Sequence, residues 1–212
     1  MSTNASQLER LTFFSDAVFA IAITLLVIEI HVPRLGVASD HAYLDALGEL
    51  GPSFFGFVLS FLVIGALWAS HHRVFGMLAD YDRRLVMPNI LLLMLVAFMP
   101  FATALMSSNP VARVPKLFYS ATLLLAGLLQ CWLFGRALHA PYLRAHVTRS
   151  DVAAARARSW ALPMAAVLSL VMAWFVPAFS NLVLLLIPVL TRLLPRIATA
   201  RLARREAVAR GT

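Results

Sequence analysis

Two ionisable residues stand at the start of the first long apolar run of the chain. Arg10 and Asp16 lie six positions apart in the segment RLTFFSD, which continues into AVFAIAITLLVIEI. An ionisable group inside a bilayer costs about 2.5–3.5 kcal/mol on insertion scales, so such groups usually face protein or water and often mark an ion pathway. The segment therefore predicts a channel or a transporter rather than a passive membrane anchor.

A second polar cluster closes the next apolar run, in the segment FLVIGALWASHHRVF. Trp68 and His71 are three residues apart, so they share one face of a helix. Asp16 lies near the same membrane boundary, because the first run crosses outward from it. We therefore expect Trp68 or His71 to meet Asp16 or Ser15 in a hydrogen-bonded cluster.

Asn89, near the inner end of the third apolar run, is a further candidate for this cluster, since polar side chains bridge membrane helices. A metal site is not predicted. The adjacent His71 and His72 diverge by about 100° on a helix, which is poor geometry for two ligands of one ion. The sequence has no HExxH or CxxC motif and no second carboxylate at ligand spacing. We expect no cofactor.

Four residues of the first run fall on one side of a helix. At 100° per residue, Ile21, Thr24, Leu25 and Ile28 occupy an arc about 100° wide, and Asp16 lies roughly 130° from its middle. This stripe could line a pore, while the opposite side carries a buried carboxylate. A stripe that faces lipid or the protein core is the ordinary alternative.

Glu29 lies about 20 Å along the helix from Asp16, at 1.5 Å per residue. It is therefore expected at the outer membrane boundary. Two interpretations remain: a carboxylate on a water-exposed rim, or one that attracts cations to an outer mouth.

The segment Ser6-Gln7-Leu8-Glu9 has the pattern of a capping box. It predicts that the first helix begins at Gln7, with Ser6 as its N-cap.

The composition indicates an all-α integral membrane protein. Of the 212 residues, 61% are hydrophobic and 13% are charged, whereas a soluble domain is about 25% charged. We expect one six-helix transmembrane domain over residues 1–212, with a basic cytoplasmic tail at 195–212. The expected spans are about 11–30, 53–70, 86–106, 117–138, 160–176 and 179–194, and 151–158 is expected to form an interfacial helix.

The positive residues predict the orientation. With six spans, one side carries 15 Lys and Arg and the other carries 3, which places both termini in the cytoplasm by the positive-inside rule. This distribution also argues against nucleic acid as the partner behind the net charge of +8. The tail is expected to rest on anionic headgroups, with a regulatory lipid or partner site as the alternative.

These blocks resemble one known family. The pattern Arg10-x-x-x-Phe14-Ser15-Asp16, followed by AVFAIAITLLVIEI, closely resembles the signature of bacterial transmembrane protein 175 family potassium channels, relatives of the lysosomal potassium channel. The blocks FLVIGALWASHHRVF and PNILLLMLVAFMPFATAL are similar to the same family. The resemblance is specific over about the first 110 residues, and covers the later runs only in hydropathy and length.

The resemblance implies a homotetramer of six-helix chains in a bacterial inner membrane, with the first helices around a central pore. It implies a cation channel that prefers K+ over other monovalent cations and has no carbonyl filter, and the sequence has no TVGYG-like loop. Ile21 would be the narrowest layer and Thr24 the hydroxyl layer, with Leu25 and Ile28 as further pore-facing positions. The residues that match those holding the first helix in place are Arg10, Phe14, Ser15, Asp16, Trp68 and His71.

A secondary transporter and an enzyme are the two alternative functions. A proton-coupled secondary cation transporter could use Asp16 and His71, but the chain shows no inverted repeat and no paired broken helices. An enzyme is not expected, because no nucleophile and base stand at a recognisable spacing.

Overall fold

The structure is a computed structural model that describes residues 3–31, 33, 36, 39–80, 82–139 and 142–211. It is helical, and six of its described helices are long and apolar enough to cross a membrane. The expectation of an all-α protein with six membrane helices is confirmed. The elements, in chain order, are α1 (Thr3–Leu25), η1 (Leu26–Glu29), α2 (Asp40–Glu49), α3 (Gly51–Gly76), η2 (Arg83–Leu85), α4 (Val86–Ser107), α5 (Arg113–Ala137), α6 (Arg149–Ser159), α7 (Ala161–Phe175), η3 (Pro177–Leu186) and α8 (Ile187–Gly211).

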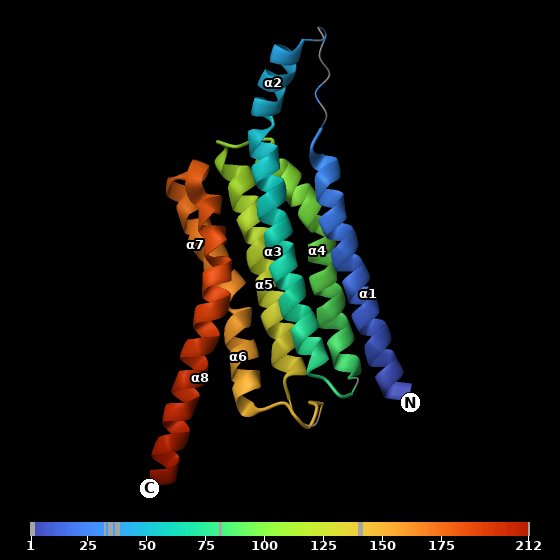
Figure 1. Cartoon of the computed structure of the whole chain (residues 1–212), viewed down its shortest axis with the longest axis vertical. Helices are drawn as coiled ribbons and strands as arrows, with labels where there is room; N and C mark the ends of the chain where they lie inside the picture. Colours follow the sequence, from blue (N-terminus) through green and yellow to red (C-terminus); the bar gives the residue numbers. More distant parts are fainter. Residues whose placement is uncertain are drawn as a thin grey trace.

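The long helices stand side by side, with α1 at one flank and α8 at the other (Figure 1). Helices α4 and α5 are the most deeply packed, since 56% and 50% of their apolar windows are buried. The corresponding share is 22% for both the α1–η1 span and the last span. The first helix therefore leaves most of its apolar surface without a partner inside one chain.

Hydroxyl groups join the central helices. Tyr119 of α5 and Ser60 of α3 are hydrogen-bonded at 2.8 Å, and Thr103 of α4 donates to Ser60 at 2.7 Å. All three side chains are buried. A buried hydroxyl without such a partner would be costly in an apolar interior, so this triad helps to fix how the three helices face one another.

Gly127 allows α5 and α7 to approach closely. A Cβ atom at this position would lie 2.8 Å from Cδ of Pro163, closer than real Cβ contacts occur. Glycine has no Cβ, so the two helices can touch there.

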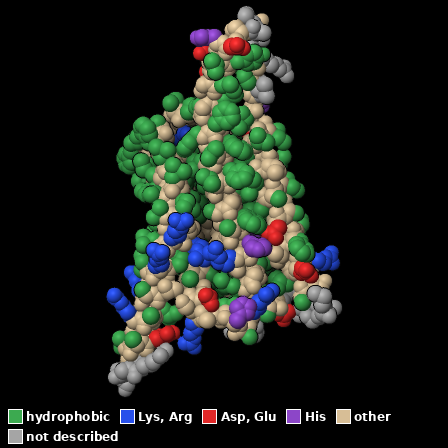
Figure 2. All heavy atoms as spheres, viewed as in Figure 1, with side chains coloured by type: hydrophobic (Ala, Val, Ile, Leu, Met, Phe, Trp, Pro, Cys, Tyr) green, Lys and Arg blue, Asp and Glu red, His purple; other side chains and the backbone are tan. Residues whose placement is uncertain are grey.

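Both termini lie at the same end of the molecule (Figure 1). On the face shown in Figure 2, Lys and Arg side chains gather toward that end, while hydrophobic side chains cover the middle. We call this the basic end. Helix α8 continues through the basic tail to Gly211. Arg34, one of the positive residues counted in the outer loop, lies outside the described residues.

The ends of two helices differ from the sequence pattern. Helix α1 begins at Thr3, so Ser6 lies inside the helix and the predicted start at Gln7 is wrong. Helix α2, which hydropathy does not indicate, begins after Ser39, whose side chain accepts from the Ala42 amide at 3.2 Å. The segment predicted as an interfacial helix lies within α6, which opens on a capping box between Thr148 and Asp151.

Candidate functional site

Helix α1 has one packed face and one open face. The packed face consists of buried residues spaced by three, four or seven positions, as on one side of a helix. They are Leu8, Ser15, Phe19 and Ala22 of α1 and Leu26 of η1. The packed face therefore fixes which side of α1 turns away from the rest of the chain.

The predicted stripe lies on the open face. Ile21 is 58% exposed, Ile28 is 67% exposed and Leu25 is 39% exposed, and Thr24 is exposed between them. The Thr24 hydroxyl donates to the Ile21 carbonyl at 2.9 Å. Its oxygen thus keeps lone pairs that no described residue uses, because a hydroxyl has one proton and two acceptor sites.

A buried chain of hydrogen bonds ties α1 to α4 and α3. The Asn89 amide donates to the Ser15 hydroxyl at 2.9 Å, and Nε2 of His71 pairs with Oδ1 of Asn89 at 2.8 Å. An amide oxygen can only accept, so this pairing places the imidazole proton on Nε2. Ser15, His71 and Asn89 are each 0% exposed. The three residues are brought together from three different helices.

His71 is also held by aromatic rings. It stacks on Phe75 with centroids 4.0 Å apart, and its ring lies 5.5 Å from that of Phe19. Its Nδ1 atom is buried and has no hydrogen-bond partner among the described residues. Unpaired buried polar atoms are uncommon, and Nδ1 of His71 is such an atom in this network.

Asp16 belongs to a second, partly exposed cluster beside the first. Nε1 of Trp68 donates to Oδ1 of Asp16 at 2.8 Å, and Nδ1 of His72 lies 3.7 Å from its Oδ2. The Asp16 side chain is 30% exposed and that of His72 is 59% exposed. The rings of Trp68 and His72 lie 5.4 Å apart. Helices α1 and α3 are therefore joined through a carboxylate as well as through Asn89.

The structure changes the partners within the expected cluster. The imidazole beside the Asp16 carboxylate belongs to His72, while His71 reaches Ser15 through Asn89. A contact between His72 and Asp16 was not predicted. The signal that could have found it is its spacing, because His72 lies four residues after Trp68 on one helical face.

Arg10 and Phe14 lie apart from both clusters. Arg10 is exposed, and Phe14 is 55% exposed. By the 100° rule both fall on the same side of α1 as Ile21, not on the packed side. Within one chain, therefore, neither residue joins Ser15 and Asp16 in holding the helix.

Glu29 is the last residue of η1, at the end of the first span opposite to the N-terminus (Figure 1). The His31 ring lies 3.0 Å from the Glu29 carbonyl. In the described part of the chain, no three His, Cys, Asp or Glu residues group as metal ligands would.

Comparisons with known proteins point to one family. A model of the family described as "Endosomal/lysosomal potassium channel TMEM175" matches residues 10–100. A potassium channel of Chamaesiphon minutus is 43% identical over 122 residues, and one of Streptomyces collinus is 47% identical over 98 residues. These matches cover 56% and 46% of the chain, and they span 60% and 47% of the relatives' own lengths.

A solved structure decides the assignment. The crystal structure of a lysosomal potassium-selective channel TMEM175 homolog from Chamaesiphon minutus superposes with a TM-score of 0.77 at 32% identity. The alignment covers 87% of this chain and 96% of that one. The chain belongs to the TMEM175 family. Its region matched by the TMEM175 family model, residues 10–100, contains every residue of the two clusters and of the open stripe.

Other TMEM175 proteins are more distant. A Gallus gallus relative, named an endosomal/lysosomal proton channel, is 37% identical over 105 residues, which cover 47% of this chain and 21% of that protein. A crystal structure of the potassium channel MtTMEM175 matches with a TM-score of 0.54 at 16% identity, over 93% of each chain. The latter supports the TMEM175 fold alone.

Proposed function

We propose that this chain forms a potassium-preferring cation channel, a homotetramer whose pore is lined by α1. The observation that carries the proposal is the open face of α1. This face presents Ile21, Thr24, Leu25 and Ile28, while hydrogen bonds hold the opposite face against α3 and α4. The bacterial relatives named potassium channels, and the TMEM175 structure whose title calls it potassium-selective, support the same activity.

In the proposed tetramer, four Ile21 side chains form a narrow apolar collar. Such a collar gates by dewetting, because water and hydrated ions are excluded from a constriction that offers no polar partner. In the proposed pore, no ring of carbonyls replaces the hydration shell of the ion, so we expect modest selectivity. Leu25 and Ile28 continue the apolar wall, and Glu29 draws cations to the outer mouth.

The proposed channel sits in a bacterial inner membrane as a single transmembrane domain, with the basic end and the tail at 195–212 in the cytoplasm. The gathering of Lys and Arg toward one end supports this orientation (Figure 2). As a channel, the protein is not an enzyme.

The subunit number tests the assembly. In detergent, the protein part of the particle is expected to have four times the chain mass of 23.3 kDa, measured by light scattering coupled to gel filtration. A monomer has a single α1 and cannot enclose a pore, so a monomeric particle that still conducts in liposomes would contradict the proposal.

Thr24 supplies the selectivity. Thr24→Val removes the hydroxyl and keeps the shape, so the K+ over Na+ preference should fall while K+ conductance persists. Thr24→Ser keeps the hydroxyl and should retain the preference. Reversal potentials under bi-ionic conditions measure both variants. An unchanged preference in Thr24→Val would remove this hydroxyl from the ion path.

Asp16 holds the inner part of α1. Asp16→Ala takes the acceptor from Trp68 and the neighbouring carboxylate from His72, and should weaken the tetramer or change channel opening. Asp45→Ala is the matched control, because Asp45 pairs with His41 at 2.9 Å in solvent, where such pairs contribute about 0–1 kcal/mol. Subunit number and single-channel currents should change only in Asp16→Ala.

A proton-coupled secondary cation transporter is the second candidate. It is favoured by the unpaired Nδ1 of His71, beside the cluster of Asp16 and His72. Single-channel currents discriminate the two candidates, because a channel passes discrete currents in a planar bilayer and a carrier does not.

A further inference from the structure

A hollow opens between α3, α6 and α8 toward the basic end of the molecule. Its volume is about 450 Å³, and we call it the basic hollow. Four arginines from three helices line it, together with small and hydroxyl side chains: Arg73, Arg158, Arg192, Arg196, Ala66, Ala69, Ser70, Thr191 and Pro195. No carboxylate is among these lining residues.

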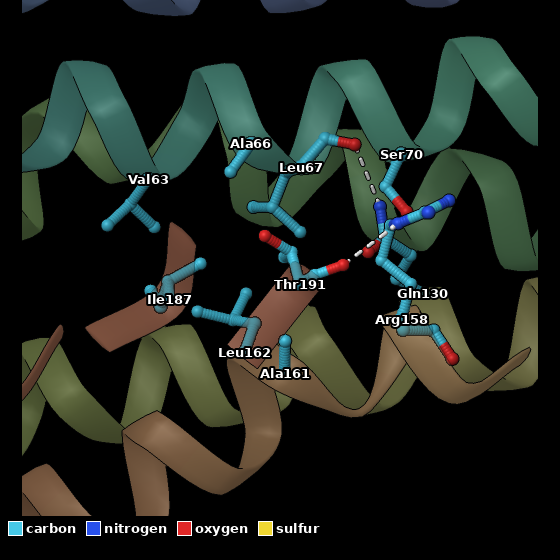
Figure 3. Close-up of a pocket in the computed structure, with 11 residues that line it drawn as sticks. Val63, Ala66, Leu67, Ser70, Gln130, Arg158, Ala161, Leu162, Ile187 and Thr191 are labelled. Atoms are coloured by element: carbon cyan, nitrogen blue, oxygen red, sulfur yellow. Dashed lines mark hydrogen bonds between the residues drawn. The ribbon is translucent and has the colours of Figure 1, made fainter. Parts of the chain in front are cut away.

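The arginines of the basic hollow form no ion pair with a carboxylate among the described residues. The ion pairs of the described residues are His41 with Asp45 and Asp16 with His72, so none of the four arginines forms one there. Nε of Arg158 donates to the Thr191 carbonyl at 3.3 Å (Figure 3). This bond holds the guanidinium at the rim and leaves its terminal nitrogens without a hydrogen bond to a described residue. The four positive charges that line the basic hollow repel one another, so the hollow favours an anion.

A small apolar groove of about 30 Å³ lies beside the basic hollow, between α3, η3 and α8. In Figure 3, Val63 of α3 faces Ile187 of α8, and both lie away from Ser70 and Arg158. The groove is lined by leucines and other apolar side chains of α3, η3 and α8: Leu59, Leu62, Val63, Ala66, Leu184, Leu185, Ile187 and Pro188. Ala66 lines both the groove and the basic hollow, so the two are neighbours on α3.

We propose that the basic hollow and the groove bind one anionic phospholipid of the inner leaflet. The phosphate lies among the arginines, whose planar donor groups match phosphate oxygens. An acyl chain lies over the groove, against the exposed side chains of Leu62 and Leu185. The hollow lies at the end where positive residues gather, which is the level of the anionic headgroups. A free phosphate ion would match the arginines but leave the apolar groove unexplained.

Lipid retention by the purified full-length chain tests the site. The protein in detergent is mixed with dioleoyl phosphatidylglycerol or with dioleoyl phosphatidylcholine, and bound lipid is counted by native mass spectrometry. The hollow variant carries Arg73→Gln, Arg192→Gln and Arg196→Gln, three exposed positions. Its matched control carries Arg201→Gln, Arg204→Gln and Arg205→Gln, three exposed positions further along α8 with the same loss of charge.

Phosphatidylglycerol should bind the hollow variant more weakly by about fivefold for each arginine removed. The control variant should stay within about twofold of the unmodified chain, since its arginines lie outside the site. Equal losses in the two variants would mean that the basic end attracts anionic lipid without a site. A hollow variant that keeps its lipid, or that loses subunits instead of lipid, would overturn the proposal as well.

A second variant separates a lipid from a free anion. Ala66→Phe places a ring where the groove meets the basic hollow, and it changes no charge. It should abolish retention of phosphatidylglycerol while inorganic phosphate, measured by calorimetry, still binds. If Ala66→Phe keeps the lipid, or if inorganic phosphate binds as tightly as phosphatidylglycerol, the site holds phosphate alone and the lipid proposal is wrong. These readouts measure binding, so they do not depend on channel activity.

Discussion

Replacing Ile21 by asparagine is expected to raise K+ flux through reconstituted liposomes by about tenfold, equivalent to a barrier lower by about 1.4 kcal/mol. The polar amide gives water a partner in the collar, so the collar no longer dries and the cost of ion entry falls. A fluorescent flux assay at matched protein density measures the change. Flux equal to that of the unmodified chain would remove Ile21 from the gate.

Val27→Asn is the control for this experiment. Val27 is 54% exposed, close to the 58% of Ile21, and it lies about 110° from the middle of the predicted stripe at 3.6 residues per turn. The same polar side chain at this position should leave flux unchanged. A rise in both variants would indicate a general leak of the membrane around α1 instead of a wetted collar.

Replacing Asn89 by leucine is expected to lower the free energy of unfolding by about 2–4 kcal/mol, since each buried group left without its partner costs about 1–3 kcal/mol. Nε2 of His71 loses its acceptor, and the Ser15 hydroxyl loses the amide from which it accepts, while it still donates to the Leu11 carbonyl at 2.8 Å. Unfolding by SDS in mixed micelles measures the loss. Asn109→Leu, at an exposed residue that donates to the Leu105 carbonyl at 3.1 Å, should cost far less.

A double variant separates polarity from packing at this site. His71→Phe alone leaves the Asn89 oxygen unpaired, whereas His71→Phe with Asn89→Leu removes both members of the pair. The phenyl ring can keep the stacking on Phe75. The double variant should therefore lose less stability than the sum of the single variants. Additive losses would mean that the hydrogen bond between His71 and Asn89 contributes nothing.

Much of the fold could be predicted because the bilayer leaves a chain few choices. A segment in lipid must satisfy its backbone internally, so a long apolar run in this chain can only be a helix. The ends of helices follow other rules. Helix α3 runs on through His71, His72 and Arg73 to Gly76, because polar side chains at the membrane boundary do not interrupt backbone hydrogen bonds. The hydropathy of the sequence therefore indicates where contact with lipid ends, but not where the helix ends.

The two local errors have a common cause. Ser6 and Glu9 match a capping box, but a cap needs an extended residue, and the helix already begins at Thr3. The true cap at Ser39 precedes α2, where no apolar run drew attention to a helix. Short capping motifs occur at several positions in a sequence. The stability of the whole helix decides at which of them the helix begins.

The sequence placed the right residue types near one another, and the contact of Trp68 with Asp16 was among the expected ones, but the partner of each histidine was not predicted. On a helix, His71 and His72 point about 100° apart, so only one of them can enter the bundle beside Phe19. That choice depends on how α3 is rotated against α1 and α4, which is a property of the packed core. The sequence also could not show that the hydroxyls of Ser60, Thr103 and Tyr119 meet, since they come from three helices.

The bonds that fix α1 are all near one end. Directional hydrogen bonds from α3 and α4 reach it at Ser15 and Asp16, while beyond them its packed face makes apolar contacts, which are non-directional. Hydrogen bonds therefore fix α1 near the basic end, and the helix can tilt about that point. At 1.5 Å per residue, Ile21 lies about 7.5 Å and Ile28 about 18 Å from Asp16. A tilt about this point would displace the outer mouth more than twice as far as the collar.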